Sequence, residues 1–203
     1  MQKFSFRTPS MAALILGYDA WAATYDEDVR RLGYATPERI ADALCECVAD
    51  RNAHLLDVGA GTGLLGKELH GRGFRHLIGM DASYGMLSEA ARKGIYGGLS
   101  RMALGCPLGF ANQTFDGLLA AGIFSSGHVS PESFTEICRV VRPGGWVVFS
   151  LKWDGLFENI FLPAIRLLEV SKQWQRHAWS ALYPSWPGAD PAMRARVLTY
   201  RVL

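Results

Sequence analysis

Glycines and acidic residues gather between residues 55 and 81 in a pattern typical of a nucleotide-binding site. The stretch LLDVGAGTGLLG, residues 55–66, is an apolar run that leads into closely spaced glycines. A strand that ends in glycines and continues into a helix lets the backbone approach a ligand, and the helix N-terminus offers N–H groups. Asp81 follows Gly63 at the distance expected for a carboxylate that accepts hydrogen bonds from a ribose diol. These residues therefore predict a ligand that contains a nucleoside.

The glycines fit two different binding patterns. Counted from Gly61, G-T-G-L-L-G matches the G-x-G-x-x-G of dinucleotide-binding proteins, which would indicate a nicotinamide-dependent oxidoreductase. Counted from Gly59, the triplet is G-A-G-T-G, and Asp57 precedes it inside the strand. A carboxylate there suits a ligand with an amino group and would repel a pyrophosphate, although a structural role for Asp57 is an alternative. The second pattern is favoured, and Gly66 is then expected to permit close packing of the helix against a strand.

Apolar segments alternate between strand and helix patterns along the chain. Short apolar runs predict strands, and apolar residues at helical spacing predict helices between them. The predicted strands cover residues 53–58, 76–81, 99–104, 115–122, 146–151, 174–183 and 194–203, and the predicted helices 17–32, 36–49, 63–73, 84–94, 131–141 and 157–173. Too few residues separate the last two strands for a crossover helix. We therefore expect an α/β fold with helices on both faces of a mostly parallel sheet and one antiparallel strand near the C-terminus.

Several of these segments together resemble the class I S-adenosylmethionine (SAM)-dependent methyltransferases. They are LLDVGAGTG, GMDAS followed by GML, FDGLLAAG, and RPGG before a strand. The likeness runs from about Tyr18 to about Trp153, and YDAWAATYD and YGMLSEAARKGIYGGL are most similar to the methyltransferase-like proteins of the Williams–Beuren region. The resemblance implies a Rossmann-like sheet of seven strands. It also implies SAM as cofactor, S-adenosylhomocysteine (SAH) as product and methyl transfer as the activity.

The resemblance also implies which residues contact the cofactor. Asp57 would orient the amino group of SAM, directly or through water, and Asp81 would accept from its ribose hydroxyls. The other implied contacts are Gly59, Ala60, Gly61, Ala121 and Gly122 with the methionine part, Ala82 and Met86 with the adenine, and Tyr18, Trp21 and Tyr25 in a helix that covers the cofactor. An ordinary core role is the alternative for these aromatic residues. Many relatives carry an acid that binds the adenine amino group, but this chain has LGCPLG there, so Leu104, Gly105 and Cys106 would have to act through backbone atoms.

No motif in the sequence marks the methyl acceptor. His128 is the candidate general base, with a loop or helix-capping role as the alternative, and Lys152, Trp153 and Asp154 are candidates for contact with the acceptor. A sulfonium already activates its methyl group, so the protein mainly positions the acceptor for in-line displacement and excludes water. A small molecule is the expected acceptor, with a protein side chain second. The alternatives are a SAM-binding regulator, or a lyase or pericyclase that binds SAM without transferring its methyl group.

Composition and charge narrow the expected partners and location. The 203 residues carry a net charge of +2, which gives no reason to expect nucleic acid or an anionic membrane as a partner. The four cysteines form no C-x-x-C and no cluster with histidine, so no metal site is expected. This cysteine usage and the short apolar run near the start predict a cytoplasmic protein without a signal peptide. We expect a single domain: cap helices in residues 1–50, a SAM-binding core in 51–151, and a helix and hairpin in 152–203.

Overall fold

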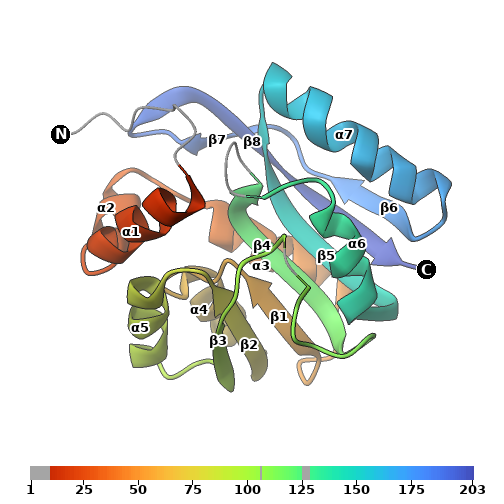
Figure 1. The fold of residues 1–203 in the computed structure, drawn as a ribbon, viewed down its shortest axis with the longest axis horizontal. Coiled ribbons are helices and arrows are strands. Elements are labelled where there is room, and N and C mark those ends of the chain that lie inside the picture. The colour runs from red at the N-terminus through yellow and green to blue at the C-terminus, as the bar shows by residue number, and fades with distance from the viewer. Residues whose placement is uncertain (1–9, 106, 125–128) are drawn as a thin grey trace.

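The computed structural model of the chain describes residues 10–105, 107–124 and 129–203, and its centre is a twisted β-sheet (Figure 1). The strands within these residues are β1 (His54–Val58), β2 (His76–Asp81), β3 (Gly98–Arg101), β4 (Phe115–Phe124), β5 (Val141–Trp153), β6 (Trp174–Trp179), β7 (Tyr183–Trp186) and β8 (Asp190–Val202). Their order across the sheet is β3-β2-β1-β4-β5-β8-β6, and β7 pairs with β8 beside this path. The strands β1 to β5 pair in parallel, whereas β8 runs antiparallel to its neighbours. The predicted α/β fold is confirmed.

The C-terminal part of the sheet contains one strand more than expected. The segment predicted as a single strand over 174–183 forms β6 and the start of a separate strand, β7. The long strand β8 pairs with β6 along its C-terminal half, and with β7 along its N-terminal half. The extra strand satisfies backbone N–H and C=O groups of β8 that β6 does not reach.

Seven helices are present in the described residues. They are α1 (Met11–Trp21), α2 (Tyr25–Arg31), α3 (Thr36–Cys47), α4 (Leu64–Gly71), α5 (Tyr84–Arg92), α6 (Ser133–Val140) and α7 (Gly155–Val170). In this part of the chain, no helix has both the length and the apolar character needed to cross a bilayer.

The expectation of one helix over residues 17–32 is wrong, because the chain turns between α1 and α2. The N–H of Thr24 bonds to the carbonyl of Trp21 at 3.1 Å, which closes a turn. The Asp28 carboxylate accepts hydrogen bonds from the indole N–H of Trp21 and the hydroxyl of Thr24, both at 2.8 Å. These bonds fix the turn, and the acidic first turn of α2 favours a new helix N-terminus at this point.

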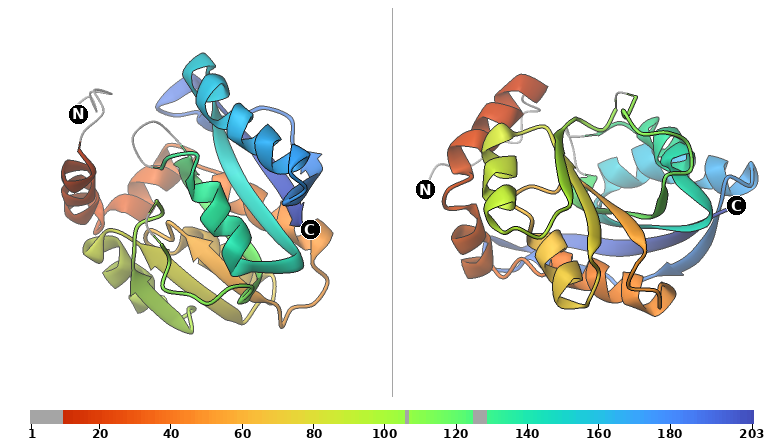
Figure 2. Two further views of the ribbon diagram at one scale, coloured as in Figure 1. Left: turned by 45° about the vertical axis from the view of Figure 1, so that its right-hand side comes forward. Right: turned by 90° about the horizontal axis from the view of Figure 1, so that it is seen from below.

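Helices cover both faces of the sheet, as predicted (Figure 2). Alternate residues along the central strands point to opposite faces. On β4, Leu118 and Ala120 belong to the core under α6 and α7, whereas Leu119 belongs to the core under α3 and α4. On β5, Phe149 and Val148 divide between the two cores in the same way. The sheet is therefore buried on both sides, which leaves its strand ends as the place for a ligand.

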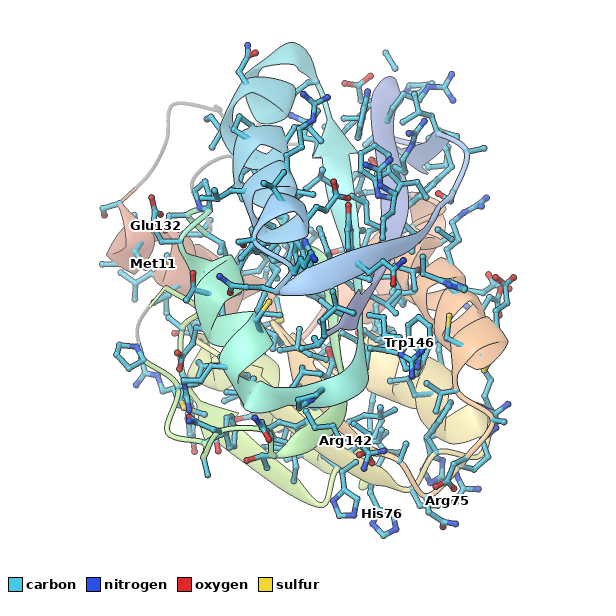
Figure 3. All side chains as sticks on the ribbon, turned by 90° about the vertical axis from the view of Figure 1, so that its right-hand side faces the viewer. Met11, Arg75, His76, Glu132, Arg142 and Trp146 are labelled. Carbon is cyan, nitrogen blue, oxygen red and sulfur yellow. The ribbon has the colours of Figure 1, made fainter. Side chains whose placement is uncertain are left out.

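The side of the sheet where the parallel strands begin and the side where they end are covered by different elements. In Figure 3, His76 and Arg142, from the starts of β2 and β5, lie at one edge, and Met11 of α1 and Glu132 lie at the other. The helices α1 and α2 therefore lie over the edge where the parallel strands end. In open α/β sheets, ligands bind at this edge.

Candidate functional site

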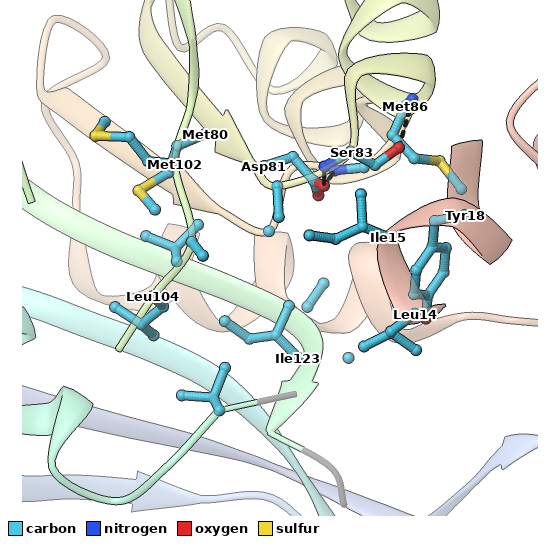
Figure 4. Close-up of a pocket in the computed structure, with 18 of the residues that line it drawn as sticks. Leu14, Ile15, Tyr18, Met80, Asp81, Ser83, Met86, Met102, Leu104 and Ile123 are labelled. Atoms are coloured by element: carbon cyan, nitrogen blue, oxygen red, sulfur yellow. Dashed lines mark hydrogen bonds between the residues drawn. The ribbon is translucent and has the colours of Figure 1, made fainter. Parts of the chain in front are cut away.

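A cavity lies at the carboxyl ends of β1, β2 and β4, next to α1 (Figure 4). Its free volume is about 160 Å³. Its wall consists mainly of three groups of residues: the strand ends with the glycine loop after β1, the segments that follow β2 and β3, and the N-terminal helices. The cavity thus joins the nucleotide-binding elements that the sequence predicts with a cap formed by the first helices.

Asp81, at the end of β2, lies on the cavity wall and is held by backbone N–H groups. The N–H of Gly61 donates to its Oδ2 at 2.9 Å, and the N–H of Ser83 donates to its Oδ1 at 2.8 Å. Burial raises the pKa of this carboxyl, and the N–H groups of Ser83 and Gly61 oppose the rise. Each carboxylate oxygen keeps a lone pair for a further donor, so the side chain fits a diol.

Asp57 lies beneath the glycine loop, and its side chain is 1% exposed. The hydroxyl of Tyr96 donates to its Oδ2 at 2.6 Å, and its Oδ1 has no hydrogen-bond partner within the described residues. Burial raises the pKa of Asp57 to about 7; the charge of Asp81 adds to this rise, and the Tyr96 hydrogen bond opposes it. One buried acceptor atom is thus left for a donor that the described residues do not supply.

Gly66 leaves room for the Tyr96 side chain. A Cβ at position 66 would lie 2.2 Å from the Tyr96 hydroxyl oxygen, and one at Gly79 would lie 3.0 Å from the same ring. The partner of Gly66 is therefore not a strand, as expected, but the side chain of Tyr96 from the segment between α5 and β3. The third glycine of the apparent dinucleotide pattern is therefore explained by access of Tyr96 to Asp57.

The helix α1 is joined to the core through Asp19. Its Oδ1 accepts a hydrogen bond from the Ser83 hydroxyl at 2.5 Å and another from the Gly85 N–H at 2.8 Å. These two bonds lower the pKa of Asp19, which stays ionised at neutral pH. Ser83 is also the N-cap of α5, since its Oγ accepts from the Met86 N–H at 3.1 Å. The cap thus attaches to the first turn of α5, directly after Asp81.

The helix α2 is joined to the glycine loop and to the far end of α5 through Asp26. Its Oδ1 accepts from the Thr62 hydroxyl at 2.5 Å, and its Oδ2 lies 2.8 Å from Nζ of Lys93. Lys93 also donates to the carbonyl of Thr62 at 2.5 Å. The two cap helices are therefore attached to the core at separate points, α1 at the start of α5 and α2 at the glycine loop and the end of α5.

Aromatic side chains extend the cavity wall on the cap side. Tyr18 and Tyr25 line it, and burial together with the charge of Asp81 raises the pKa of Tyr18 to about 12. Tyr34 and Trp186 line it as well, with their rings stacked at a centroid distance of 4.6 Å. At neutral pH the tyrosine hydroxyls of this wall are hydrogen-bond donors rather than bases.

A methyltransferase family model and a methyltransferase-like protein match this chain. Residues 56–149 match a family model described as a methyltransferase domain. Methyltransferase-like protein 27 of Homo sapiens is 34% identical, over 91% of this chain and 83% of that protein. The chain belongs to the class I SAM-dependent methyltransferases.

Solved structures share the fold of this methyltransferase. Magnesium protoporphyrin IX methyltransferase from Synechocystis PCC 6803, solved with bound SAH, is similar with a TM-score of 0.69 at 15% identity, over 93% of this chain and 94% of that chain. The [4+2]-cyclase SpnF is similar with a TM-score of 0.64 at 17% identity, over 81% of each chain. At these identities the likeness concerns the fold alone, and the same fold carries proteins named for different reactions.

SAM is the cofactor of this methyltransferase, as the sequence predicts, and the chemistry of the cavity fits it. The positive φ of Gly59, at +69°, turns the backbone at the end of β1, and a Cβ there would meet Ile123 at 2.2 Å. The same wall carries the paired oxygens of Asp81 for a diol, and Asp57 lies beneath it with one oxygen unpartnered. A nucleoside that also carries an amino group matches this set of donors and acceptors.

Most of the expected contact residues line the cavity. They are Tyr18, Tyr25, Gly59, Gly61, Asp81, Ala82, Met86, Leu104, Ala121 and Gly122. The expected residues in the described part of the chain that do not line it are Trp21, Asp57, Ala60 and Gly105. Trp21 bonds to α2 instead, and the Ala60 N–H bonds to the carbonyl of Met80 at 2.9 Å. Cys106 and His128 lie outside the described residues.

The side chains expected near the acceptor do not reach the described cavity wall. Lys152 pairs with Asp154 at 2.9 Å, and the Arg196 guanidinium lies 4.6 Å from the ring centroid of Trp153. The wall also contains residues that the sequence analysis did not name, among them Met11, Leu14, Ile15, Tyr34, Ile123, Val129 and Trp186. Ser83 carried a usable signal, because a serine before a helix predicts an N-cap. Tyr34 and Trp186 have no local signal, because they meet only in the folded chain.

Proposed function

We propose that this methyltransferase transfers the methyl group of SAM to an uncharged small molecule in the cavity beside α1. The observation that carries the cofactor site is the Asp81 carboxylate, which two backbone N–H groups hold on the wall beside the glycine loop. In this proposal Asp81 binds the ribose hydroxyls, and Gly59, Gly61, Ala121 and Gly122 contact the methionine part. Ala82, Met86 and the backbone at Leu104 surround the adenine.

The acceptor class follows from the charge of the wall. Among the described residues that line the cavity, Asp81 alone carries a formal charge. The remainder of the wall consists largely of apolar side chains, including those of Leu14, Ile15, Ile123 and Val129. A charged acceptor would lose its hydration here without gaining a partner, so an uncharged acceptor with an apolar body fits better.

The protein contributes positioning and exclusion of water to the reaction. When bound, SAM supplies a methyl group that its positive sulfonium already activates. An apolar wall and a cap of two helices keep water from competing as acceptor. Tyr18 cannot remove a proton at neutral pH, because its pKa is about 12.

The cofactor site is tested by calorimetry with SAM and SAH. We expect binding by the wild type, and a loss of more than about 1.5 kcal/mol, or about tenfold in affinity, for Asp81→Ala, because two charge-assisted hydrogen bonds disappear. The matched control is Glu46→Ala, an exposed carboxylate of α3 that does not line the cavity. No binding by the wild type at millimolar ligand would refute the site, and an unchanged affinity of Asp81→Ala would refute the ribose assignment.

A SAM-binding protein without methyl transfer is the second candidate, because the [4+2]-cyclase SpnF shares the fold. Both candidates predict the same binding results. They separate in an assay for SAH formation with a panel of uncharged apolar acceptors. Release of SAH in step with acceptor consumption supports methyl transfer, and acceptor conversion without SAH supports the second candidate.

We also propose that the chain works as one domain. Residues 1–50 cap the SAM-binding core of residues 51–151, and residues 152–203 complete the sheet. The attachment of both cap helices to the core by Asp19 and Asp26 supports this organisation.

A further inference from the structure

Tyr96 occupies a space beneath the glycine loop that three glycines leave open. Added Cβ atoms at Gly63, Gly66 and Gly79 would lie 3.1, 2.2 and 3.0 Å from atoms of this side chain. These glycines come from the N-terminal end of α4 and from β2. Any side chain at Gly66 would displace the Tyr96 hydroxyl, so the room left for Tyr96 is a specific feature of this site.

A hydrogen bond joins the Tyr96 side chain in this space to Asp57. The hydroxyl donates to Oδ2 at 2.6 Å, within the range of strong bonds to a carboxylate. Oδ1 is buried and has no hydrogen-bond partner in the described part of the chain. An unpartnered buried acceptor is costly, and a ligand donor would remove this cost. Asp57 stands two residues before Gly59, where the methionine part of SAM is placed by the proposed function.

We propose that Tyr96 is a positioning residue for SAM. Tyr96 holds the Asp57 carboxylate ionised and oriented, so that Oδ1 accepts a hydrogen bond from the ammonium group of the cofactor, directly or through one water. This proposal rests on the proposed function, because it needs the methionine part above Asp57. Tyr96 is absent from the described cavity wall and acts through Asp57.

Ionisation of Asp57 links this arrangement to pH in the neutral range. Burial raises the pKa of Asp57 to about 7. Three titratable groups face Asp57. The hydrogen bond from Tyr96 lowers the pKa of Asp57, and the charge of Asp81 on β2 raises it. The charge of Asp57 in turn raises the pKa of Tyr34. The nearby N–H of Gly66, at the start of α4, also lowers the pKa of Asp57, and no hydrogen bond from it reaches Oδ1. Loss of the Tyr96 hydroxyl removes one stabilising bond from the charged form and therefore raises the pKa of Asp57 further.

The test is calorimetry of SAH binding to the wild type and to Tyr96→Phe between pH 6 and pH 8. If the ionised form of Asp57 binds, the wild type gains about tenfold in affinity over this range. Tyr96→Phe is then weaker than the wild type by up to roughly tenfold at pH 6, where Asp57 is largely protonated in both proteins, and by less at pH 8. The ratio at each pH cancels the titration of the ligand itself. Tyr84→Phe, at an exposed position of α5, is the matched control and is expected to follow the wild type.

A second pair of variants tests the same bond through the glycine. Gly66→Ala forces the Tyr96 hydroxyl away from Asp57 and is expected to show the same dependence on pH as Tyr96→Phe. Gly71→Ala is the matched control, because it lies in the same helix and its Cβ would meet nothing within 4 Å.

The outcomes separate this inference from the proposed function. No SAH binding by the wild type at any pH overturns both. Binding by the wild type with a variant that is weakened equally at every pH overturns the inference alone, because a merely structural role of Tyr96 has no such pH signature. An unchanged affinity of Tyr96→Phe also overturns the inference. A ratio that shrinks from pH 6 to pH 8 supports it.

Discussion

We expect the stability of Asp57→Asn relative to the wild type to be greater at pH 8 than at pH 5 when no ligand is bound. Burial raises the pKa of this carboxyl from 3.8 to about 7 in the folded chain. When the pKa of a carboxyl is higher in the folded than in the unfolded state, the protonated carboxyl contributes to stability. This contribution is complete at a pH below the pKa of the unfolded state, and it is lost as the pH rises through the pKa of the folded state. The wild type therefore loses stability between about pH 4 and pH 7 through Asp57, and Asp57→Asn does not.

The size of the effect follows from the two pKa values. Their difference corresponds to roughly 4 kcal/mol of unfolding free energy once ionisation in the folded protein is complete. Between pH 5 and pH 8 the expected part is roughly 2.5 kcal/mol, or about 5–10 °C in melting temperature for a chain of this length. The amide group of asparagine changes the free energy of unfolding by the same amount at every pH. The prediction therefore concerns how the difference between the two proteins changes with pH.

The assay is urea unfolding of the free protein at several pH values between 5 and 8, followed by circular dichroism. The matched control is Asp50→Asn, which makes the same chemical change at an exposed position. We expect the free energies of unfolding of the wild type and Asp57→Asn to diverge steadily as the pH rises. Parallel curves for these two proteins would refute the buried, ionisable Asp57. At pH 8 the more stable variant is expected to bind SAH less well than the wild type, because an amide carries no charge for the ammonium group.

Two further predictions concern the glycine loop and the cap. Gly59→Ala puts a Cβ 2.2 Å from a side-chain carbon of β4 at a backbone φ of +69°, so we expect a loss of more than about 2 kcal/mol in stability. The control Gly94→Ala, at a φ of +63° with no atom within 4 Å of its Cβ, should lose only about 1 kcal/mol. Equal melting temperatures of the two variants would contradict the clash at Gly59. Asp19→Asn weakens the hydrogen bonds to the Ser83 hydroxyl and to the first turn of α5. We therefore expect SAH to dissociate roughly threefold to tenfold faster from this variant, measured by stopped flow. A dissociation rate equal to that of the control Glu27→Gln would show that α1 does not hold the ligand.

The regular parts of the fold were predictable because each buries a recognisable pattern. The strands β1 and β2 are short apolar runs followed by residues that allow a turn, and both lie where they were predicted to within one residue. The turn between α1 and α2 was not predictable from helical spacing. It depends on the Asp28 side chain, which competes for the donors of Trp21 and Thr24. The strand β7 was missed because β8, which lies next to it in the sheet, provides its pairing groups.

The cavity residues divide in the same way. Gly59, Gly61 and Asp81 were predicted because each stands at or shortly after the end of a strand, where parallel strands bring their ends together. Tyr34 and Trp186 were missed because their stacking joins the first helices to the hairpin near the C-terminus. Pairs of this kind have no spacing rule, since packing of distant elements brings them together.

The sequence by itself determined the family, the cofactor and the carboxylates at the ends of the first two strands, because glycines and acids that follow strands lie in short segments. Only the tertiary structure decided what Asp57 does with its charge. Burial under the loop raises its pKa to about 7, and Tyr96, 39 residues away, reaches it through the space that Gly66 leaves open. The environment of a titratable group is the sum of everything packed around it, and no local stretch of sequence contains that sum.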